Sequence, residues 1–323
     1  MKLLKSIAIT AILGLAIGFF AFMSYTVVKN NKEIQTFVVD FHKGESLSSL
    51  AADLKSKKLI LNEDLFKIQA VVLDYDKKLQ PGEYQLTSRM TGLDILKKIS
   101  KGKVVYHKVT IPEGLTVKEI FNLINNEENL TGKISVEIKE GYLLPETYSF
   151  RKGDSKNSVI LQMQSAMETA LDAVWNSRDD KSVDAQIKSK QELLKLASIV
   201  EKETIIDKEK PIVANVYLNR LELGMRLQAD PTVIYGAKNY KGDITYKMLR
   251  EKNDFNTYVI FGLPKTAIAN PGVESLKAVA NPANTKFLFF VADGKGGHVF
   301  SETYEQHKKK VADYLKTLKQ NGN

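Results

Sequence analysis

The 323-residue chain contains no cysteine, one tryptophan and four histidines. The absence of cysteine excludes a disulfide scaffold, a thiolate metal site and a cysteine nucleophile. The histidines lie far apart and show neither H-x-x-x-H nor H-E-x-x-H spacing, which argues against a zinc site. The sequence has no G-x-S-x-G elbow and lacks the full motif set around S-x-x-K, so it does not indicate a serine hydrolase. We therefore expect no metal and no cofactor.

Acidic residues are outnumbered by basic ones, 38 to 47, which gives a formal net charge of +9. This balance favours an anionic partner such as anionic lipid or an acidic wall polymer, unless the charges simply cover solvated helix faces. No helix-turn-helix, RRM or zinc-finger pattern supports nucleic-acid binding, and we expect none.

Long apolar runs are also scarce, and the single one lies at residues 6–28, after Lys2 and Lys5. As a helix this uncharged run would span about 30 Å, the thickness of a bilayer core. A cleaved signal peptide is the alternative, but its apolar region is normally shorter and ends in small residues, whereas this run ends AFMSYTVV. The sequence predicts a cytoplasmic tail (1–5) and a single-pass anchor (6–28), with the body outside the bacterial inner (plasma) membrane.

A polar linker at residues 29–35 leads to a predicted small domain at 36–105. Its pattern gives a strand at 37–41, helices near 46–57, 63–73 and 91–102, and a second strand after the turn at 79–82. Ser46 and Thr91 are candidate helix caps, and Gly102 is a candidate helix stop. This order resembles LysM-like modules, which bind glycans containing N-acetylglucosamine. The alternative is that the segment shares only their fold.

Residues 106–323 predict a helix-rich domain with short strands, so the fold class is α+β. Helices are expected near 116–125, 156–176, 183–204, 208–223, 273–280 and 303–319, and strands at 286–293 and from His298. The stretch 237–272 reads as mostly loop.

The helix predicted at 183–204 ends in Glu201, Lys202 and Glu203. At about 100° per residue from Leu193, Glu201 falls near 80°, inside the apolar arc. Lys202 falls near 180° on the wet side, and Glu203 near 280° at the edge of the arc. A carboxyl on an apolar face is desolvated, which favours a general acid. A run of solvated charges is the alternative; it explains Lys202 better than Glu201.

Several long motifs occur together in the second half of the chain. They closely resemble the endolytic murein transglycosylase family, MltG or YceG-like, over roughly residues 107–320. The matching segments are GYLLPETYSF (141–150), ASIVEKET (197–204), NVYLNRLELGMRLQADPTVIYG (215–236), FNTY (255–258), GLPKTAIANPG (262–272) and FVADGKGGHVFS (290–301).

The resemblance implies a lytic transglycosylase that cleaves the β-1,4 bond between N-acetylmuramic acid and N-acetylglucosamine within peptidoglycan strands. The muramyl C6 hydroxyl attacks in place of water and leaves a 1,6-anhydro end. One carboxyl group can serve as acid and then as base, and the family's catalytic glutamate is carried over to Glu201. The resemblance also associates the chain with ending nascent strands and with peptidoglycan synthases as partners.

Further polar residues in these motifs are candidates for substrate binding, or they hold loops by hydrogen bonds. They are Gln228, Asp230, Thr232, Tyr235, Asn219, Arg220, Asn256, Tyr258, Glu146 and Tyr148. Two alternative functions stay open: a hydrolytic peptidoglycan glycosidase that uses a second carboxylate such as Asp230, and a non-catalytic scaffold that binds the wall through the LysM-like segment.

Overall fold

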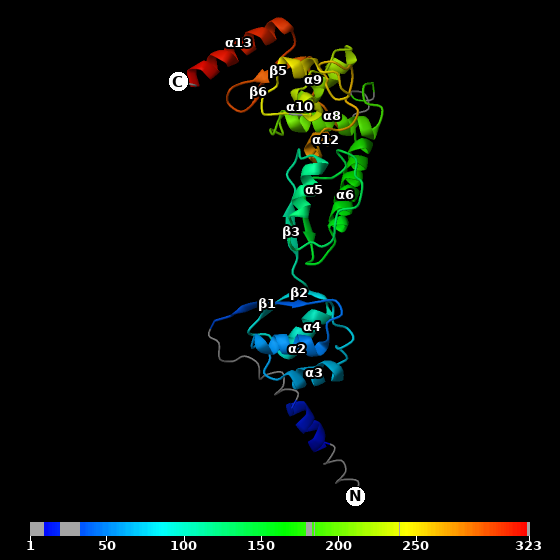
Figure 1. The fold of residues 1–323 in the computed structure, drawn as a ribbon, viewed down its shortest axis with the longest axis vertical. Coiled ribbons are helices and arrows are strands. Elements are labelled where there is room, and N and C mark those ends of the chain that lie inside the picture. Colours follow the sequence, from blue (N-terminus) through cyan, green and yellow to red (C-terminus); the bar gives the residue numbers. More distant parts are fainter. Residues whose placement is uncertain (1–9, 20–32, 179–182, 184, 239, 322–323) are drawn as a thin grey trace. The chain divides into compact units, whose positions relative to one another are not determined.

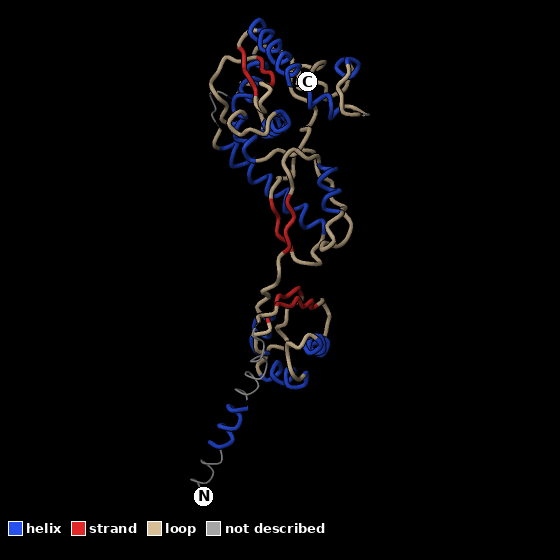
Figure 2. The backbone as a smooth tube through the Cα atoms, turned by 90° about the vertical axis from the view of Figure 1, so that its left-hand side faces the viewer, coloured by secondary structure: helices blue, strands red, loops and turns tan. Residues whose placement is uncertain are grey.

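The computed structural model describes residues 10–19, 33–178, 183, 185–238 and 240–321. The chain divides into two units, Met1–His107 with Ser149–Asp154, and Lys108–Tyr148 with Ser155–Asn323 (Figure 1). In the described ranges, the strands form three separate two-stranded sheets, drawn in red in Figure 2. Helices and strands are thus mixed, as predicted. The assignment of residues 36–105 as LysM-like and 106–323 as catalytic stays a prediction.

The first unit packs three helices against one antiparallel sheet. Strands β1 (Thr36–Phe41) and β2 (Gly82–Thr87) pair from Thr36 opposite Thr87 to Phe41 opposite Gly82. The helices are α2 (Leu47–Ser56), α3 (Glu63–Val72) and α4 (Gly92–Ser100). Alternate strand residues point to one core with the apolar helix faces, including Val39, Phe41, Leu50, Leu54, Tyr84, Leu86, Ile95 and Ile99.

The predicted caps of this unit are confirmed. Ser46 accepts a hydrogen bond from the Ser49 N–H, and Thr91 forms a capping box with Asp94. Gly102 follows α4 with a φ of 60°, the left-handed conformation that ends helices. Each cap satisfies backbone groups that the helix itself leaves unpaired.

The second unit is mainly helical. Its elements are β3 (His107–Thr110), α5 (Val117–Asn125), β4 (Thr147–Phe150), α6 (Lys156–Asn176), α8 (Lys190–Glu203), α9 (Lys210–Glu222), α10 (Asp230–Gly236), α11 (Tyr246–Arg250), α12 (Val273–Ala280), β5 (Phe289–Ala292), β6 (His298–Ser301) and α13 (Tyr304–Asn321). Helix α8 lies at the centre, in contact with α6, α9, α10 and α12. Its buried residues form one core with those of α9 and α12.

One sequence expectation for this unit is wrong. Helix α8 begins at Lys190 and not near 183, because Ser189 caps it by accepting from the Glu192 N–H. The stretch 237–272 is mostly loop in its described part, as expected, apart from the short helix α11, which Thr245 caps.

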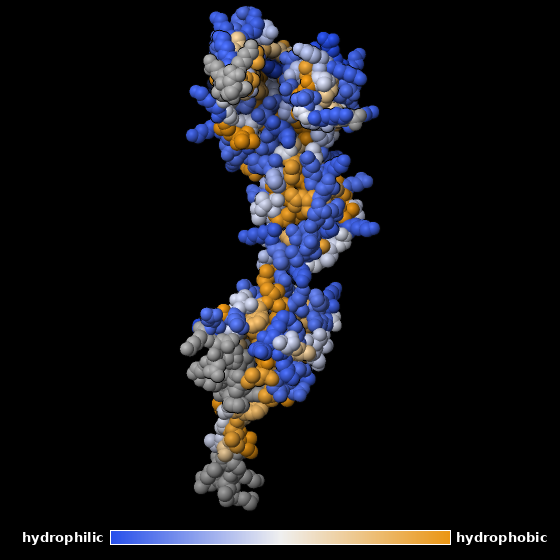
Figure 3. All heavy atoms as spheres, turned by 60° about the vertical axis from the view of Figure 1, so that its left-hand side comes forward, coloured by the Kyte–Doolittle hydropathy of each residue, from blue (hydrophilic) through white to orange (hydrophobic). Residues whose placement is uncertain are grey.

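The transmembrane helix predicted at residues 6–28 is not borne out. The structure describes a helix over residues 10–19, and none of the helices within the described ranges is both long and apolar enough to cross a membrane. This helix exposes large apolar side chains, visible as orange atoms near the N-terminal end in Figure 3: Ile12, Leu13, Leu15, Ile17 and Phe19. The remainder of that prediction, with the tail 1–5 and linker residues 29–32, lies outside the described residues.

We expect Thr91→Ala to lower the free energy of unfolding of the first unit by about 1 kcal/mol, because the capping box is lost. Chemical denaturation measures this. The exposed Ser48 on α2 provides the control, and Ser48→Ala should change the value by less than about 0.5 kcal/mol. Equal effects of both substitutions would contradict the capping role.

Candidate active site

The last turn of α8 carries two carboxyl groups with different surroundings. Glu201 is buried, with 7% of its surface exposed, whereas Glu203 is half-buried at the last residue of the helix. Lys202 between them is exposed and donates to the Gly114 carbonyl. The helical turn thus sends the two carboxyl groups to different neighbours.

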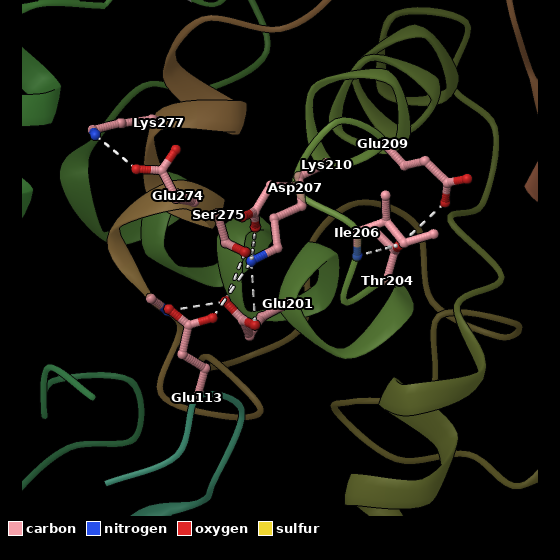
Figure 4. A network of polar contacts seen from close by, with 11 residues as sticks. Glu113, Glu201, Thr204, Ile206, Asp207, Glu209, Lys210, Glu274, Ser275 and Lys277 are labelled. Carbon is pink, nitrogen blue, oxygen red and sulfur yellow. Dashed lines mark hydrogen bonds and ion pairs between the residues drawn. The ribbon is translucent and has the colours of Figure 1, made fainter. Parts of the chain in front are cut away.

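Glu201 caps the start of a neighbouring helix. Its Oε2 accepts hydrogen bonds from the Gly272 N–H at 2.9 Å and from the Ser275 hydroxyl at 2.7 Å (Figure 4). Gly272 is the N-cap residue of α12 and has no side chain to cap it, so a carboxylate from α8 takes that place and meets the positive end of the helix dipole. A Cβ at Gly272 would lie 1.7 Å from Glu113 Oε1, so a larger residue there would displace the Glu113 side chain.

A buried lysine joins this carboxyl group to two others. Lys210 Nζ lies 3.6 Å from Glu201 Oε1, 3.5 Å from Glu113 Oε2 and 3.2 Å from Asp207 Oδ1 (Figure 4). Burial acts to lower the pKa of Lys210, but Glu201 and the other carboxylates outweigh it and raise that pKa. Burial and then the charge of Glu201 raise the pKa of Glu113, which Lys210 partly offsets. Glu201 is therefore held by donors and a cation inside a compensated cluster.

Glu203 instead opens on a cavity of about 280 Å³. The cavity wall combines aromatic and polar side chains from α8, α9, α10, β5, α13 and the intervening loops: Glu203, Tyr217, Arg220, Gln228, Asp230, Tyr258, Phe289, Phe290, Tyr304 and His307. Aromatic faces with a few fixed polar groups are the usual lining of a small-molecule site.

The surroundings of Glu203 prepare it to carry a proton at neutral pH. Protein surrounds the carboxyl group on the sides away from the cavity, and this burial raises its pKa to about 7. The Tyr217 hydroxyl, which donates to Oε1 at 2.6 Å, opposes the rise, whereas the negative charge of Asp230 adds to it. A general acid works best when its pKa lies near the operating pH, and Glu203 meets that condition.

Four of the polar candidates named from the sequence line this cavity: Gln228, Asp230, Tyr258 and Arg220. The Tyr258 hydroxyl donates to Asp230 Oδ1 at 2.6 Å, which joins the two across 28 residues of sequence. Gln228 has a φ of 50°, which is unusual for a residue with a side chain, and its N–H donates to the Thr257 carbonyl. Such backbone strain is concentrated at functional sites. Arg220 donates to the Leu227 and Leu288 carbonyls.

The other predicted residues hold the surrounding loops. Thr232 bonds with Ala229 and Thr257, and Asn256 donates to carbonyls of α11 and Glu251. Asn219 donates to the Thr285 and Phe287 carbonyls. Outside these loops, Tyr235 donates to Glu140, Tyr148 donates to the Leu144 carbonyl, and Glu146 is exposed next to β4.

Sequence reasoning found Tyr258 but missed the other aromatic residues of the cavity and the cluster around Lys210. Phe289 and Phe290 fall in an apolar strand that reads as core, and Tyr304 and His307 begin a polar helix. No spacing signal linked these residues, because α8, α9, the β5–β6 hairpin and α13 meet only in the folded chain.

A family model described as the YceG-like family matches residues 39–313. The chain belongs to the YceG-like family. The match includes both units and the cavity residues, and it confirms the resemblance inferred from the motifs.

Three proteins place the YceG-like chain among its relatives. It is 29% identical to an endolytic murein transglycosylase of Bacillus subtilis, over 88% of this chain and 86% of that protein. An endolytic murein transglycosylase of Streptococcus pneumoniae is 25% identical over 88% of the chain, which spans 59% of that longer protein. A crystal structure of a YceG-like protein from Listeria monocytogenes matches with a TM-score of 0.51 and 30% identity, over 86% of this chain and 99% of that one.

We expect Lys210→Met to lower the free energy of unfolding by about 3–5 kcal/mol at neutral pH, because it leaves the buried Glu201 carboxylate without its cation. The loss should shrink as pH falls, since protonation neutralises the carboxyl groups and removes the need for the cation. Denaturation of both proteins between pH 5 and pH 8 measures this. A loss of stability independent of pH would contradict the ion-pair reading.

Proposed function

We propose that this YceG-like chain is an endolytic lytic transglycosylase of peptidoglycan, a carbon–oxygen lyase. The cavity around Glu203 carries the proposal, because it combines a carboxyl group of pKa about 7 with aromatic and polar walls. Relatives named endolytic murein transglycosylase support the substrate class and the reaction. They also support a role at the cell wall, outside the cytoplasm.

The geometry favours Glu203 over Glu201 as the acid–base group. Glu203 lines the cavity, accepts one hydrogen bond and has a raised pKa. Glu201 does not line it, and its contacts with Gly272, Ser275 and Lys210 occupy both of its carboxyl oxygens. The sequence-based assignment of Glu201 stays a prediction that the experiment below tests against Glu203.

In the proposed reaction, protonated Glu203 donates its proton to the oxygen that bridges muramyl C1 and the next sugar. The C1–O bond breaks, and the departing N-acetylglucosamine keeps the proton as its 4-hydroxyl group. The muramyl C6 hydroxyl then bonds to C1 and gives its proton to the Glu203 carboxylate. The group ends as it began, protonated, and no water is consumed.

A hydrolase is the second candidate, because Asp230 adds a carboxylate to the same cavity. Ordinary glycosidases pair an acid with a second carboxylate that activates water or attacks C1. Here the Tyr258 hydroxyl already occupies an oxygen of Asp230. The relatives named endolytic murein transglycosylase favour the transglycosylase over this alternative. For the first unit we propose glycan binding in the LysM-like manner, supported by its resemblance to such modules; synthase partners remain a prediction.

We expect Glu203→Gln to lower the rate of peptidoglycan cleavage by about 100-fold or more, since the proton donor is lost. Digestion of purified peptidoglycan, with the ends identified by mass, measures the rate and the chemistry: anhydro ends support the transglycosylase, and reducing ends support the hydrolase.

Glu201→Gln is the matched control, changing the same group two residues away. Its expected effect is a loss of stability with cleavage retained. The reverse result would assign the acid–base role to Glu201, and no cleavage by the unsubstituted chain would favour a wall-binding scaffold.

Two cavity variants should shift the pH dependence in opposite directions. Cleavage requires protonated Glu203, so the rate falls as pH rises through its pKa. Tyr217→Phe removes a hydrogen bond that lowers this pKa and should move the falling limb to higher pH, whereas Asp230→Asn removes a charge that raises it and should move the limb to lower pH. Rates of cleavage from pH 5 to pH 9 test this. Shifts in the same direction would contradict the assignment of Glu203.

A further inference from the structure

A polar network adjoins Glu203 in the chain and is formed by residues that do not line the cavity. Thr204 directly follows Glu203, and its hydroxyl donates to Glu209 Oε2 at 3.1 Å and accepts from the Ile206 N–H (Figure 4). Glu209 is the N-cap residue of α9, but its side chain does not cap that helix. The carboxylate is instead turned toward the segment that follows Glu203.

The β5–β6 hairpin reaches the same carboxylate from the other side. The His298 N–H donates to Glu209 Oε1 at 2.9 Å, and the His298 ring Nδ1 lies 2.7 Å from Oε2. A Cβ at Gly297 would lie 2.8 Å from Glu209 Oε1, which shows how closely the hairpin approaches. One carboxylate therefore joins the end of α8, the start of α9 and the hairpin.

These three elements also build the cavity. Helix α8 supplies Glu203, α9 supplies Tyr217, and β5 supplies Phe290, whose ring meets His298 edge-on at 5.4 Å. Glu209 and His298 do not line the cavity themselves. They can affect the reaction only through the position and the charge environment of Glu203.

The charge of His298 reaches Glu203. After burial, the Tyr217 hydrogen bond and Asp230, the next influence on Glu203 is His298, whose positive charge when protonated lowers the pKa of that carboxyl. The elements packed around Glu203 and His298 carry other ionisable groups: Tyr217 and Arg220 on α9, Asp230 on α10, Tyr258, Asp293 in the hairpin and His307 on α13. In the described part of the chain, His298 forms hydrogen bonds with Glu209 and with none of these groups.

We propose that Glu209 and His298 are positioning residues, which hold Glu203 against the cavity and set the charge that it experiences. The inference rests on the proposed function, with Glu203 as the acid–base group. Neither residue exchanges a proton with the substrate. Glu209 bonds both to His298 and to Thr204, the C-cap residue of α8, and so ties the hairpin to the end of the helix that carries the acid.

The test uses the full chain with His298→Gln, Glu209→Gln and the double variant. Gln at position 209 can still accept from the His298 N–H, so it removes the charge with little change of shape. We expect kcat for peptidoglycan cleavage to fall about 10- to 100-fold through misplacement of the acid, with KM within about threefold. His298→Gln should also move the falling limb of the pH profile upward by about half a unit, since a nearby cation is lost. The kcat of the double variant should be no lower than that of the less active single variant, because the two residues act as one unit.

Asp172→Asn is the matched control, because it breaks an ion pair with Lys190 at the far end of α8. It should leave kcat and the pH profile unchanged. Thermal unfolding of each variant separates folding from positioning. The proposal is overturned if His298→Gln folds, keeps an unshifted falling limb and has a kcat within twofold of that of the unsubstituted chain. If His298→Gln does not fold, an unchanged kcat in Glu209→Gln overturns it. Full activity of Glu203→Gln would instead overturn the proposed acid–base residue, so the two failures are distinguishable.

Discussion

The second unit depends on the last turn of α8, where two carboxyl groups must be satisfied in different ways. Residues two apart on a helix point about 160° away from each other, so Glu201 and Glu203 cannot share one environment. A buried charge is tolerated only when donors or cations compensate it. For Glu201 these are the start of α12 and Lys210 of α9. Its compensation therefore fixes α12 and α9 against α8, and the walls around Glu203 follow from that arrangement.

The N-cap and the first residue of α9 repeat this contrast. Lys210 lies close to Glu201 and is the cation of the structural cluster, while Glu209 bonds to Thr204 and His298. Adjacent residues thus serve the two sides of the same helix end. A substitution of Lys210 should therefore mainly change stability, whereas a substitution of Glu209 should mainly change the rate and its pH dependence.

Local signals predicted the fold better than the site. Caps such as Thr91 and stops such as Gly102 determine helix ends through nearest neighbours, so the sequence displays them. The helical projection correctly separated Glu201 from Glu203, and Glu201 is indeed buried. The projection does not show which groups contact the carboxylate of Glu201. A carboxylate on an apolar helix face can be a reactive acid or can cap another helix. Gly272 and Lys210 decide between these, and they become neighbours of Glu201 only on folding.

The burial that prepares Glu203 as an acid suits transglycosylation. It raises the pKa of the carboxyl group to about 7, so one group can give up a proton and then take one back. The nucleophile of this reaction is a hydroxyl of the sugar itself, held in place by binding. A hydrolase would instead use a second carboxylate to activate water, and Asp230 is the candidate for that role in this cavity. A single buried carboxyl group that acts first as acid and then as base is therefore the chemistry that this cavity suits best.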